Sequence, residues 1–409
     1  MRHELHQLME ERNLDFAIVR GSLLHNPAVA YMLNGVQVFS TTIIIPRHGT
    51  PVILYNDMER DDAESTGYVL LNQKDLFNKP AENAPRDAHE RAFMTFDRMV
   101  EMTGVTGRVG LYAVGDIRRN YLLWRSLLLA RPEIELVAED VPDLFEQLRL
   151  TKDEEEIAHI GYCGSRAADV FKAMEEFLSS HSQYQGVVVD EHGVPLTVGH
   201  VKRFIALETV RRGMVVEADT IFAPGRAAGV PHNHGDVREV LRPGQTIVCD
   251  YFPRDPRTGY CFDMTRTYCL GTPPPRVQQA YDLVRRAHDA VWELLTPGAP
   301  LNSLFHKVCD VFEAAGHSTL RTNSQANSGF CHSLGHGVGL AIHELPTIPG
   351  GAGQFQQVMP GMVFTIEPGL YYPEEGWGIR LEDLAAVHSD GQIENLTQVP
   401  MKLELTLHS

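Results

Sequence analysis

The sequence predicts two domains, an α/β domain over residues 1–145 and a larger domain over residues 181–409, joined by a helical connector over residues 146–180. Three observations predict this division. The chain has 409 residues, 43% of them hydrophobic, so it can fill more than one core. Short apolar strand patterns alternate with helical patterns in the first domain. Histidines, glycines and isolated carboxylates gather in the last domain, which is therefore expected to carry the chemistry.

The elements of the first domain follow from its apolar periodicity. The expected helices span residues 4–12, 88–102 and 117–129, and the expected strands span residues 16–19, 41–45, 52–55, 69–71 and 109–112. Strands that alternate with helices favour a mixed or mostly parallel sheet. Gly104, Gly107 and Gly110 do not follow a strand and open a helix, so they do not form a dinucleotide-binding loop. This domain is interpreted as architecture.

The connector is a long helical pattern over residues 143–180, with the acidic residues 153–156 on its exposed side. Lys152 and these carboxylates are explained as ordinary surface charge, because acidic side chains near a helix start complement the helix dipole. No catalytic role is expected for them.

Two histidine-bearing stretches follow. Residues 330–346 read FCHSLGHGVGLAIHELP, in which glycines flank His336 and remove side-chain bulk, so that the backbone can approach a ligand closely. His336 is the first candidate metal ligand, and a core histidine beside a flexible loop is the alternative. A Gly/Pro-rich loop over residues 224–235 carries His232 and His234. A turn with exposed histidines explains that loop equally well.

Four carboxylates are each delivered by an apolar strand pattern. One strand ends in Asp250 and the chain returns through Asp263, which predicts a hairpin with an aspartate on each arm. Glu367 and Glu382 follow two later apolar runs. Buried carboxylates repel one another unless a cation or a shared proton lies between them. With His336 they suit two divalent ions about 3.5 to 4 Å apart, and manganese, cobalt, iron and zinc are all suitable. The alternative is five isolated surface or salt-bridged residues.

Four motifs together resemble the creatinase and methionine aminopeptidase superfamily, and within it Xaa-Pro dipeptidases and aminopeptidase P. They are Gly-Tyr-x-x-Asp263-x-Thr-Arg-Thr, His-x-x-Gly-His336-Gly-x-Gly-Leu-x-x-His343-Glu-x-Pro, Thr-x-Glu367-Pro-Gly and Gly-x-Arg380-x-Glu382-Asp. The resemblance covers roughly residues 150–400. It implies an α/β N-terminal domain of the creatinase type, followed along the chain by an α+β catalytic domain of the pita-bread fold. Because that N-terminal domain helps a neighbouring subunit close the site in the family, a homodimer is also implied.

The resemblance implies a role for each ligand. Asp250 would bind one ion, Asp263 and Glu382 would bridge two, and His336 with Glu367 would hold the second. Glu367 would also handle the proton of a bridging water. Two divalent ions are therefore expected, with manganese preferred to cobalt, zinc or iron.

Three further residues are implied to act on the substrate. His232 and His343 match the substrate-side histidines of the family, and Arg380 matches the arginine beside its last glutamate. Arg380 is expected either to grip a free substrate carboxylate or only to neutralise the carboxylate cluster. Both roles stay open on the sequence.

The chain departs from the family pattern between the first two ligands. In the family, x-Gly usually follows the first aspartate, and the second aspartate lies eleven residues after the first. In this sequence Tyr251 and Phe252 follow Asp250, and Asp263 lies thirteen residues after Asp250. A longer hairpin tip over residues 254–258 absorbs the difference. The ligands are expected to survive, while the substrate wall is expected to differ.

The leading hypothesis is hydrolysis of the peptide bond before proline, in a dipeptide or at a peptide N-terminus, by a metal-bridging hydroxide that attacks the carbonyl. A prolyl nitrogen offers no N–H, so the site needs apolar walls, for which Tyr251, Phe252 and Leu340 are candidates. The alternatives on the same fold are hydrolysis of a small cyclic amidine or amide, lyase chemistry on a small carboxylate, and a binding protein without metal.

Composition excludes other classes of partner. The formal net charge of −17 argues against nucleic acid and acidic membranes, because both need basic surfaces. The N-terminus lacks the apolar core of a secretory signal, and no run of about 18 apolar residues could span a bilayer. Six cysteines without a Cys-x-x-Cys pair indicate reduced thiols. We therefore expect a cytoplasmic protein.

Overall fold

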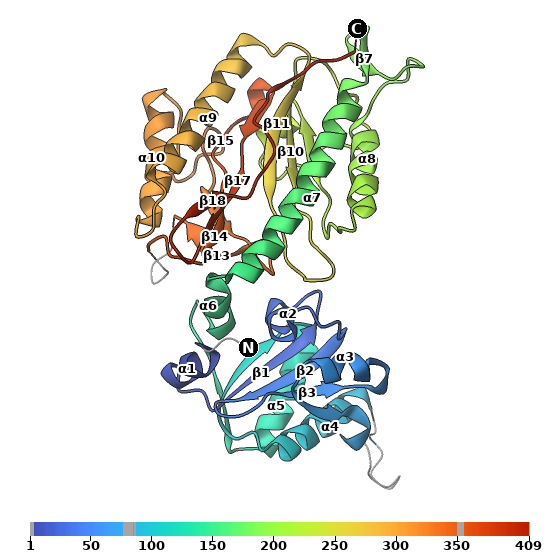
Figure 1. The fold of residues 1–409 in the computed structure, drawn as a ribbon, viewed down its shortest axis with the longest axis vertical. Helices are drawn as coiled ribbons and strands as arrows, with labels where there is room; N and C mark the ends of the chain where they lie inside the picture. The colour runs from blue at the N-terminus through green and yellow to red at the C-terminus, as the bar shows by residue number, and fades with distance from the viewer. Residues whose placement is uncertain (1–3, 77–84, 86, 350–355, 409) are drawn as a thin grey trace. The chain divides into compact units, whose positions relative to one another are not determined.

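The computed structural model describes residues 4–76, 85, 87–349 and 356–408, and the chain divides into two compact units, Met1–Arg149 and Leu150–Ser409 (Figure 1). The expected end of the first domain at residue 145 falls inside helix α6 (Leu144–Leu150). Each unit buries its own apolar cores.

The N-terminal unit is a six-stranded mixed sheet with helices on both faces. Its elements are α1 (Glu4–Glu11), β1 (Phe16–Ser22), α2 (Pro27–Leu33), β2 (Ser40–Pro46), β3 (Val52–Tyr55), α3 (Arg60–Ser65), β4 (Val69–Asn72), α4 (Ala88–Thr103), β5 (Gly107–Ala113), α5 (Ile117–Ala130), β6 (Ile134–Val137) and α6. The strand order is β4-β3-β2-β1-β5-β6, with β2 antiparallel to both of its neighbours and the other pairs parallel. The predicted mixed sheet is confirmed.

Strand β1 shows why this sheet needs cover on both sides. Val19 packs into the core that contains α1 and α2, whereas Ile18 packs with Phe96 and Trp124 of α4 and α5. Successive strand residues face opposite sides, so an uninterrupted apolar run is buried on both faces. The expected strands and helices of this unit all form, while α2, α3 and β6 are short elements that the periodicity did not reveal.

The connector differs from the predicted single helix. It breaks between α6 and α7 (Glu154–Ser179), and Asp153 begins α7 with a capping box in which Glu156 is the reciprocal partner. Glu156 does not lie on an exposed face as expected, because it is 8% exposed and accepts a hydrogen bond from Tyr260 Oη. Lys152 is also buried, in an ion pair with Glu344, so its assignment to the surface is wrong.

The C-terminal unit contains two larger sheets and two short hairpins. Its elements are α7, β7 (Ser182–Tyr184), β8 (Val187–Val189), α8 (Val198–Arg211), β9 (Ile221–Pro224), β10 (Thr246–Tyr251), β11 (Met264–Leu270), α9 (Pro275–Leu294), α10 (Leu301–Ala314), β12 (Gly335–Gly337), β13 (Glu344–Ile348), β14 (Val363–Ile366), β15 (Gly369–Tyr372), β16 (Trp377–Arg380), β17 (Asp383–Val387), β18 (Ile393–Asn395) and β19 (Glu404–Leu405). The sheets have the orders β19-β11-β10-β9 and β13-β12-β14-β17-β18.

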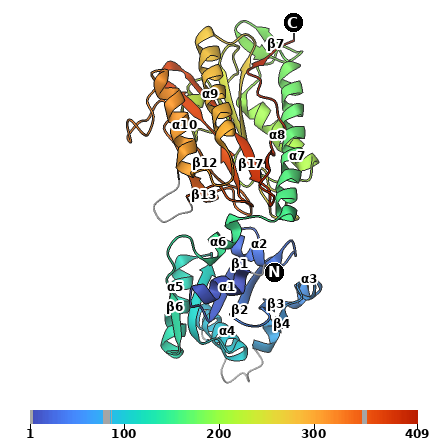
Figure 2. The same cartoon turned by 60° about the vertical axis from the view of Figure 1, so that its left-hand side comes forward.

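Two helix pairs flank these strands (Figure 2). Helices α9 and α10 lie side by side and share a core with β14 and β17, while α7 and α8 lie together on the other side of the strands. The strands are thus shielded from water, and polar side chains directed between the sheets enter apolar surroundings. Among the described helices, none has the length and apolar character that crossing a membrane requires.

Candidate metal centre

The two aspartates come from the predicted hairpin. Strands β10 and β11 pair antiparallel, with Asp250 opposite Thr265, and Asp263 immediately precedes β11. The side chains of Asp250 and Asp263 are only 14% and 6% exposed. Cys249 and Tyr251, the neighbours of Asp250, are fully buried, as alternation along an apolar strand requires. The hairpin therefore brings two carboxylates into the interior of the unit.

His336 lies in the middle of β12, between two glycines whose role differs from the expected one. A Cβ atom on Gly335 would lie 2.0 Å from Thr365 O, and a Cβ atom on Gly337 would lie 2.1 Å from Leu345 O. The absent side chains therefore allow neighbouring backbone to approach β12, rather than a ligand. The imidazole is held in place because its strand, β12, is packed closely between β13 and β14.

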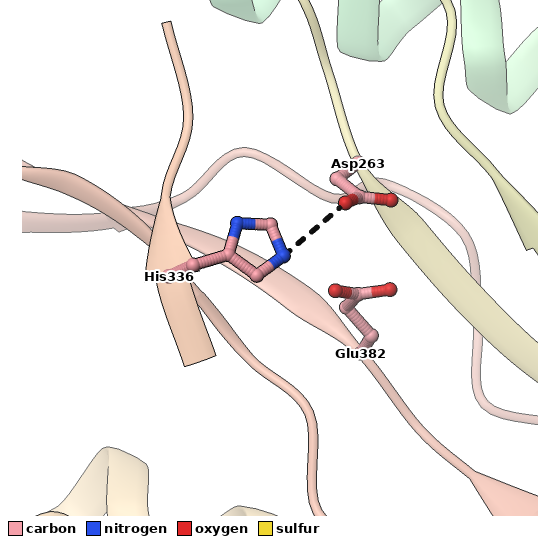
Figure 3. A group of neighbouring side chains, drawn as sticks. All are labelled: Asp263, His336 and Glu382. Carbon is pink, nitrogen blue, oxygen red and sulfur yellow. Dashed lines mark ion pairs between the residues drawn. The ribbon is translucent and has the colours of Figure 1, made fainter. Parts of the chain in front are cut away.

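Glu367 and Glu382 come from strand ends. Glu367 follows β14, and Glu382 lies between β16 and β17 and forms an isolated bridge with Thr265 of β11. One ligand atom from each of Asp263, His336 and Glu382 lies within 4.8 Å of the other two (Figure 3). His336 Nε2 is 3.6 Å from Asp263 Oδ2 and 3.7 Å from Glu367 Oε1.

The protonation of His336 suits metal binding. Burial lowers its pKa to about 4, so the ring is neutral near pH 7. Its Nδ1 lies 3.2 Å from the carbonyl oxygen of Gly337, which fixes the proton on Nδ1. The lone pair of Nε2 is then left for a cation among the carboxylates.

Nearby positive charge compensates the carboxylates only in part. Burial, with the charge of Glu382, raises the pKa of Asp263 and of Glu367 well above the ordinary range, and burial together with Asp250 raises the pKa of Glu382 to about 8. Asp250 Oδ1 and Asp263 Oδ1 are buried without a hydrogen-bond partner in the described part of the chain. Four carboxylates, two of which carry an oxygen without a hydrogen-bond partner, and one neutral imidazole form a donor set that fits hard divalent ions.

Arg380 is buried against this cluster and uses all three of its nitrogens there. Nη2 donates to Asp250 Oδ2 at 2.5 Å and Nε donates to Thr265 Oγ1 at 3.0 Å. Nη1 donates to the carbonyl oxygen of Pro231 and to Tyr371 Oη, each at 3.1 Å. These contacts favour the charge-neutralising role over the carboxylate grip, because a substrate would have to displace one of them.

The two histidines that the sequence predicts on the substrate side, His232 and His343, lie near the cluster and near each other. The rings of His343 and His336 are 4.4 Å apart in an edge-to-face arrangement. Burial and the charge of His232 lower the pKa of His343, so the two side chains share one electrostatic environment. His343 is thus partly desolvated, but both residues keep solvent-accessible surface. They are thus accessible to a substrate that reaches the carboxylates.

His332 and Tyr371 belong to the same site, although the sequence assigned no role to either. Tyr371 Oη lies 2.8 Å from His332 Nε2, and His332 Nδ1 lies 2.6 Å from the carbonyl oxygen of Ser333. Burial lowers the pKa of His332 to about 3, so the ring is neutral, with Nδ1 donating to Ser333 and Nε2 accepting from Tyr371. The His-x-x-Gly-His336 spacing could have indicated His332, whereas nothing near Tyr371 in the sequence marks it.

The three apolar residues that the sequence suggests as substrate walls differ in their burial. Tyr251 is wrong as a wall, because it is fully buried, hydrogen bonded to Thr209 and in contact with the ring of Phe171. Leu340 is 3% exposed, and Phe252 is only partly buried. Phe252 is therefore the more accessible of the two remaining candidates.

Lys152 forms a buried ion pair next to His343. Its Nζ lies 2.6 Å from Glu344 Oε1, and the two side chains are 2% and 4% exposed. The backbone N–H of Lys152 donates to the carbonyl oxygen of Gly361. The pair holds the start of α7 against the segment that carries His343, which is why Lys152 is not an ordinary surface charge.

A known protein family matches the part of the chain that contains the candidate metal ligands. Residues 158–389 match the model of Metallopeptidase family M24. The "Probable dipeptidase PepE" of Mycobacterium tuberculosis is 33% identical over 255 residues, which cover 61% of this chain and 60% of that protein. The "Xaa-Pro dipeptidase" of Pyrococcus furiosus is 29% identical over 266 residues, which cover 64% and 67%. The match to the mycobacterial relative thus spans less than two thirds of its length.

Solved structures resemble the chain over nearly its whole length. The Xaa-Pro dipeptidase from Bacillus anthracis has a TM-score of 0.75 at 22% identity and covers 99% of this chain and 98% of that one. The prolidase from Pyrococcus furiosus has a TM-score of 0.73 at 22% identity, covering 97% and 99%. At such identity the likeness shows the fold alone, and it confirms the predicted fold class.

Proposed function

Because the chain belongs to Metallopeptidase family M24, we propose that it hydrolyses the peptide bond that precedes proline, in Xaa-Pro dipeptides or at the N-terminus of short peptides. The observation that carries the proposal is the buried cluster of carboxylates around a neutral imidazole. The substrate class is supported by relatives named Xaa-Pro dipeptidase from Lactobacillus helveticus and Pyrococcus furiosus. Membership of a metallopeptidase family implies divalent metal ions.

The proposed metal ligands are those expected from the sequence, and we propose two ions with manganese preferred. The ligands are Asp250, Asp263, His336, Glu367 and Glu382. Bound divalent ions would lower the pKa of a water molecule and polarise the substrate carbonyl. The donor set of carboxylate oxygens with one imidazole nitrogen supports a hard cation over a soft one.

Glu367 is proposed to move the proton of the attacking water to the leaving prolyl nitrogen. Its carboxylate is 14% exposed, and apolar burial lets it hold a proton as well as release one. Thr365 Oγ1, which accepts from the backbone N–H of His336, lies 3.5 Å from Glu367 Oε1. This contact would keep the carboxylate beside the imidazole.

His232 and His343 are proposed to bind the substrate and to stabilise the oxyanion that develops on its carbonyl. They are exposed beside the cluster. Both ring nitrogens of His332 are already hydrogen bonded, to Tyr371 and Ser333, so His332 has no free atom for proton transfer. His332 would instead form a fixed wall.

Phe252 is proposed as an apolar wall for the proline ring. It follows Tyr251, whose side chain is buried on the other side of the strand. Alternation along an extended chain would direct Phe252 to the side of Asp250. An aromatic wall suits a prolyl nitrogen, which has no N–H to donate.

A substrate panel on the manganese-reconstituted chain tests the function. Leu-Pro, Leu-Pro amide, a Leu-Pro-Gly tripeptide and the matched control Leu-Ala are compared by release of free amino acid. The proposal expects cleavage of at least one Leu-Pro substrate and slower cleavage of Leu-Ala. Equal rates on Leu-Pro and Leu-Ala would reject proline selection. No peptide cleavage, with turnover of a cyclic amidine or a small carboxylate, would favour the alternative reactions on this fold.

We further propose a homodimer located in the cytoplasm. All six cysteines are free thiols, which suits a reducing compartment. Sedimentation of the purified chain measures the oligomeric state, and fractionation of its source cells measures the location.

A further inference from the structure

Arg266 is a buried charge directly behind the candidate ligands. Its side chain is 1% exposed, and it lies on β11. Burying a guanidinium costs several kcal/mol unless its donors are satisfied, and here every nitrogen donates. Nη2 donates to Asp383 Oδ1 at 2.7 Å, Nη1 donates to the carbonyl oxygen of Glu382 at 2.8 Å, and Nε donates to the carbonyl oxygen of Val399 at 3.1 Å.

The neighbouring residue on β11 holds Glu382 from the opposite face. The backbone N–H of Glu382 donates to the carbonyl oxygen of Thr265 at 3.0 Å, and Thr265 Oγ1 donates to Glu382 Oε2 at 2.7 Å. Alternation along the strand places Thr265 on the side of the carboxylates and Arg266 on the other side. Asp263 lies immediately before this strand. The position of Glu382 relative to Asp263 is thus set from both faces of β11.

Further hydrogen bonds hold the Asp383 side of this arrangement. Asn395 Nδ2 donates to Asp383 Oδ2 at 2.6 Å, and His288 Nε2 lies 3.4 Å from the same oxygen. A cavity of about 360 Å³ borders Arg266, His288, Asp383 and Asn395. Packing on this side is incomplete, so the hydrogen bonds add to the pairing of Asp383 with Ile366 in fixing the Glu382–Asp383 segment.

We propose that Arg266, paired with Asp383, is a positioning residue that sets the affinity of the centre for divalent ions. It fixes the spacing of two ligands, Asp263 and Glu382, without touching an ion itself. The inference rests on the metal centre of the proposed function. Partners that orient metal ligands typically contribute about 10- to 100-fold to metal affinity.

Two variants separate positioning from simple stabilisation. Arg266→Lys keeps the charge, but one ammonium group cannot reach Asp383, Glu382 and Val399 together. The double variant Arg266→Met/Asp383→Leu removes both charges, so no unpaired charge stays buried and the fold can be kept. Arg12→Lys is the matched control, because Arg12 also donates to a carboxylate and a backbone carbonyl, within the N-terminal unit.

The metal-free full chain of each variant is titrated with Mn²⁺ by calorimetry, and its melting temperature is measured without metal. The inference expects about 10- to 100-fold weaker Mn²⁺ binding by Arg266→Lys and by the double variant. It also expects the melting temperature of the double variant to stay close to wild type, and Arg12→Lys to bind Mn²⁺ as wild type does.

The outcomes distinguish the inference from the proposed function. Wild-type Mn²⁺ affinity in the double variant would overturn the positioning role, whatever the stability of Arg266→Lys. Equally weakened binding in Arg12→Lys would overturn it too, because the loss would not be specific to this pair. A wild-type chain that binds no divalent ion would overturn the metal centre itself, and the inference with it.

Discussion

Replacing Lys152 by methionine is expected to destabilise the C-terminal unit by about 3 to 5 kcal/mol, because the change leaves the Glu344 carboxylate buried without its cation. The two charged groups are 2.6 Å apart, and their side chains are 2% and 4% exposed. An exposed pair of the same type contributes only about 0.2 to 1 kcal/mol. Burial therefore decides the magnitude.

The surroundings explain why water cannot replace the missing partner. A Cβ atom on Gly339 would lie 2.2 Å from Glu344 Oε1 and 2.9 Å from Lys152 Cε. A Cβ atom on Gly361 would lie 2.8 Å from Thr151 Cβ. Two glycines thus let the backbone close around the pair. At 2.6 Å the Coulomb attraction is about 6 kcal/mol for an effective dielectric constant of about 20, and desolvation of the two ions offsets most of it.

The assay is urea denaturation of Lys152→Met, Glu344→Leu and the double variant, followed by circular dichroism. Each single variant should lose about 3 to 5 kcal/mol, whereas the double variant should lose much less than their sum. Arg285→Met is the control, since Arg285 and Asp289 form an exposed pair in the same unit. A loss below about 1 kcal/mol for Lys152→Met, or an additive double variant, would refute the buried ion pair.

Three further predictions concern the site and the surface. Glu367→Gln should keep the fold and lose several orders of magnitude in peptide turnover, whereas Asp263→Asn should lose bound metal, as measured by kinetics and elemental analysis. Arg380→Ala should slow Leu-Pro, its amide and Leu-Pro-Gly by equal factors of about 10 to 100, because its guanidinium bonds Asp250 rather than a substrate end. His388→Gln should lower the melting temperature below pH about 6.5 more than at alkaline pH.

The sign of the His388 effect follows from its neighbours. Hydrogen bonds to Glu154 and Glu394 raise the pKa of His388 above its ordinary value. Because the pKa of His388 is higher in the folded chain than in the unfolded chain, its protonated ring stabilises the fold. This contribution is complete below the pKa of the unfolded chain and is lost as the pH rises through the pKa of the folded chain. A difference between wild type and His388→Gln that grows with pH would contradict this reasoning. For Arg380→Ala, a loss of rate on Leu-Pro alone would instead support the role in which Arg380 binds the free carboxylate of the substrate.

The ligand strands could be predicted because their signals are local. Asp250 ends an uninterrupted apolar run and a turn follows soon after it, so the hairpin can be predicted from adjacent residues. The alternation of strands and helices in the N-terminal unit is equally local. The chemistry of these carboxylates already pairs them with His336, and the structure brings His336 together with Asp263 and Glu382. The resemblance to a known family adds the role of each ligand, which stays a prediction.

Other features depended on partners far along the chain. Lys152 is indistinguishable from a surface lysine until Glu344 folds against it. Tyr371 enters the site only because β15 pairs with β16 and brings it against Arg380. Glu156 is buried because Tyr260 approaches it. Local propensity carries no information about such contacts, so each was missed or misassigned.

The two glycines beside His336 show that a correct residue can be identified for an incomplete reason. The sequence suggested room for a ligand, whereas the absent Cβ atoms accommodate the backbone of Thr365 and Leu345. Either cause would fix the imidazole of His336, because a strand packed closely between its neighbours also holds the ring in place. The physical cause differs, and it predicts that Gly335→Ala would disturb strand pairing before it disturbed ligand access.

The charge balance of the cluster bears on the number of ions. Four carboxylates converge, and in the described part of the chain Arg380 is the guanidinium that bonds one of them, because Arg266 is paired with Asp383. Three negative charges remain, more than one divalent ion neutralises. A single ion would leave one carboxylate protonated or uncompensated in apolar surroundings, and both states are costly at neutral pH. Two ions with one hydroxide would balance the three remaining charges, so the charge balance supports the proposed dinuclear centre.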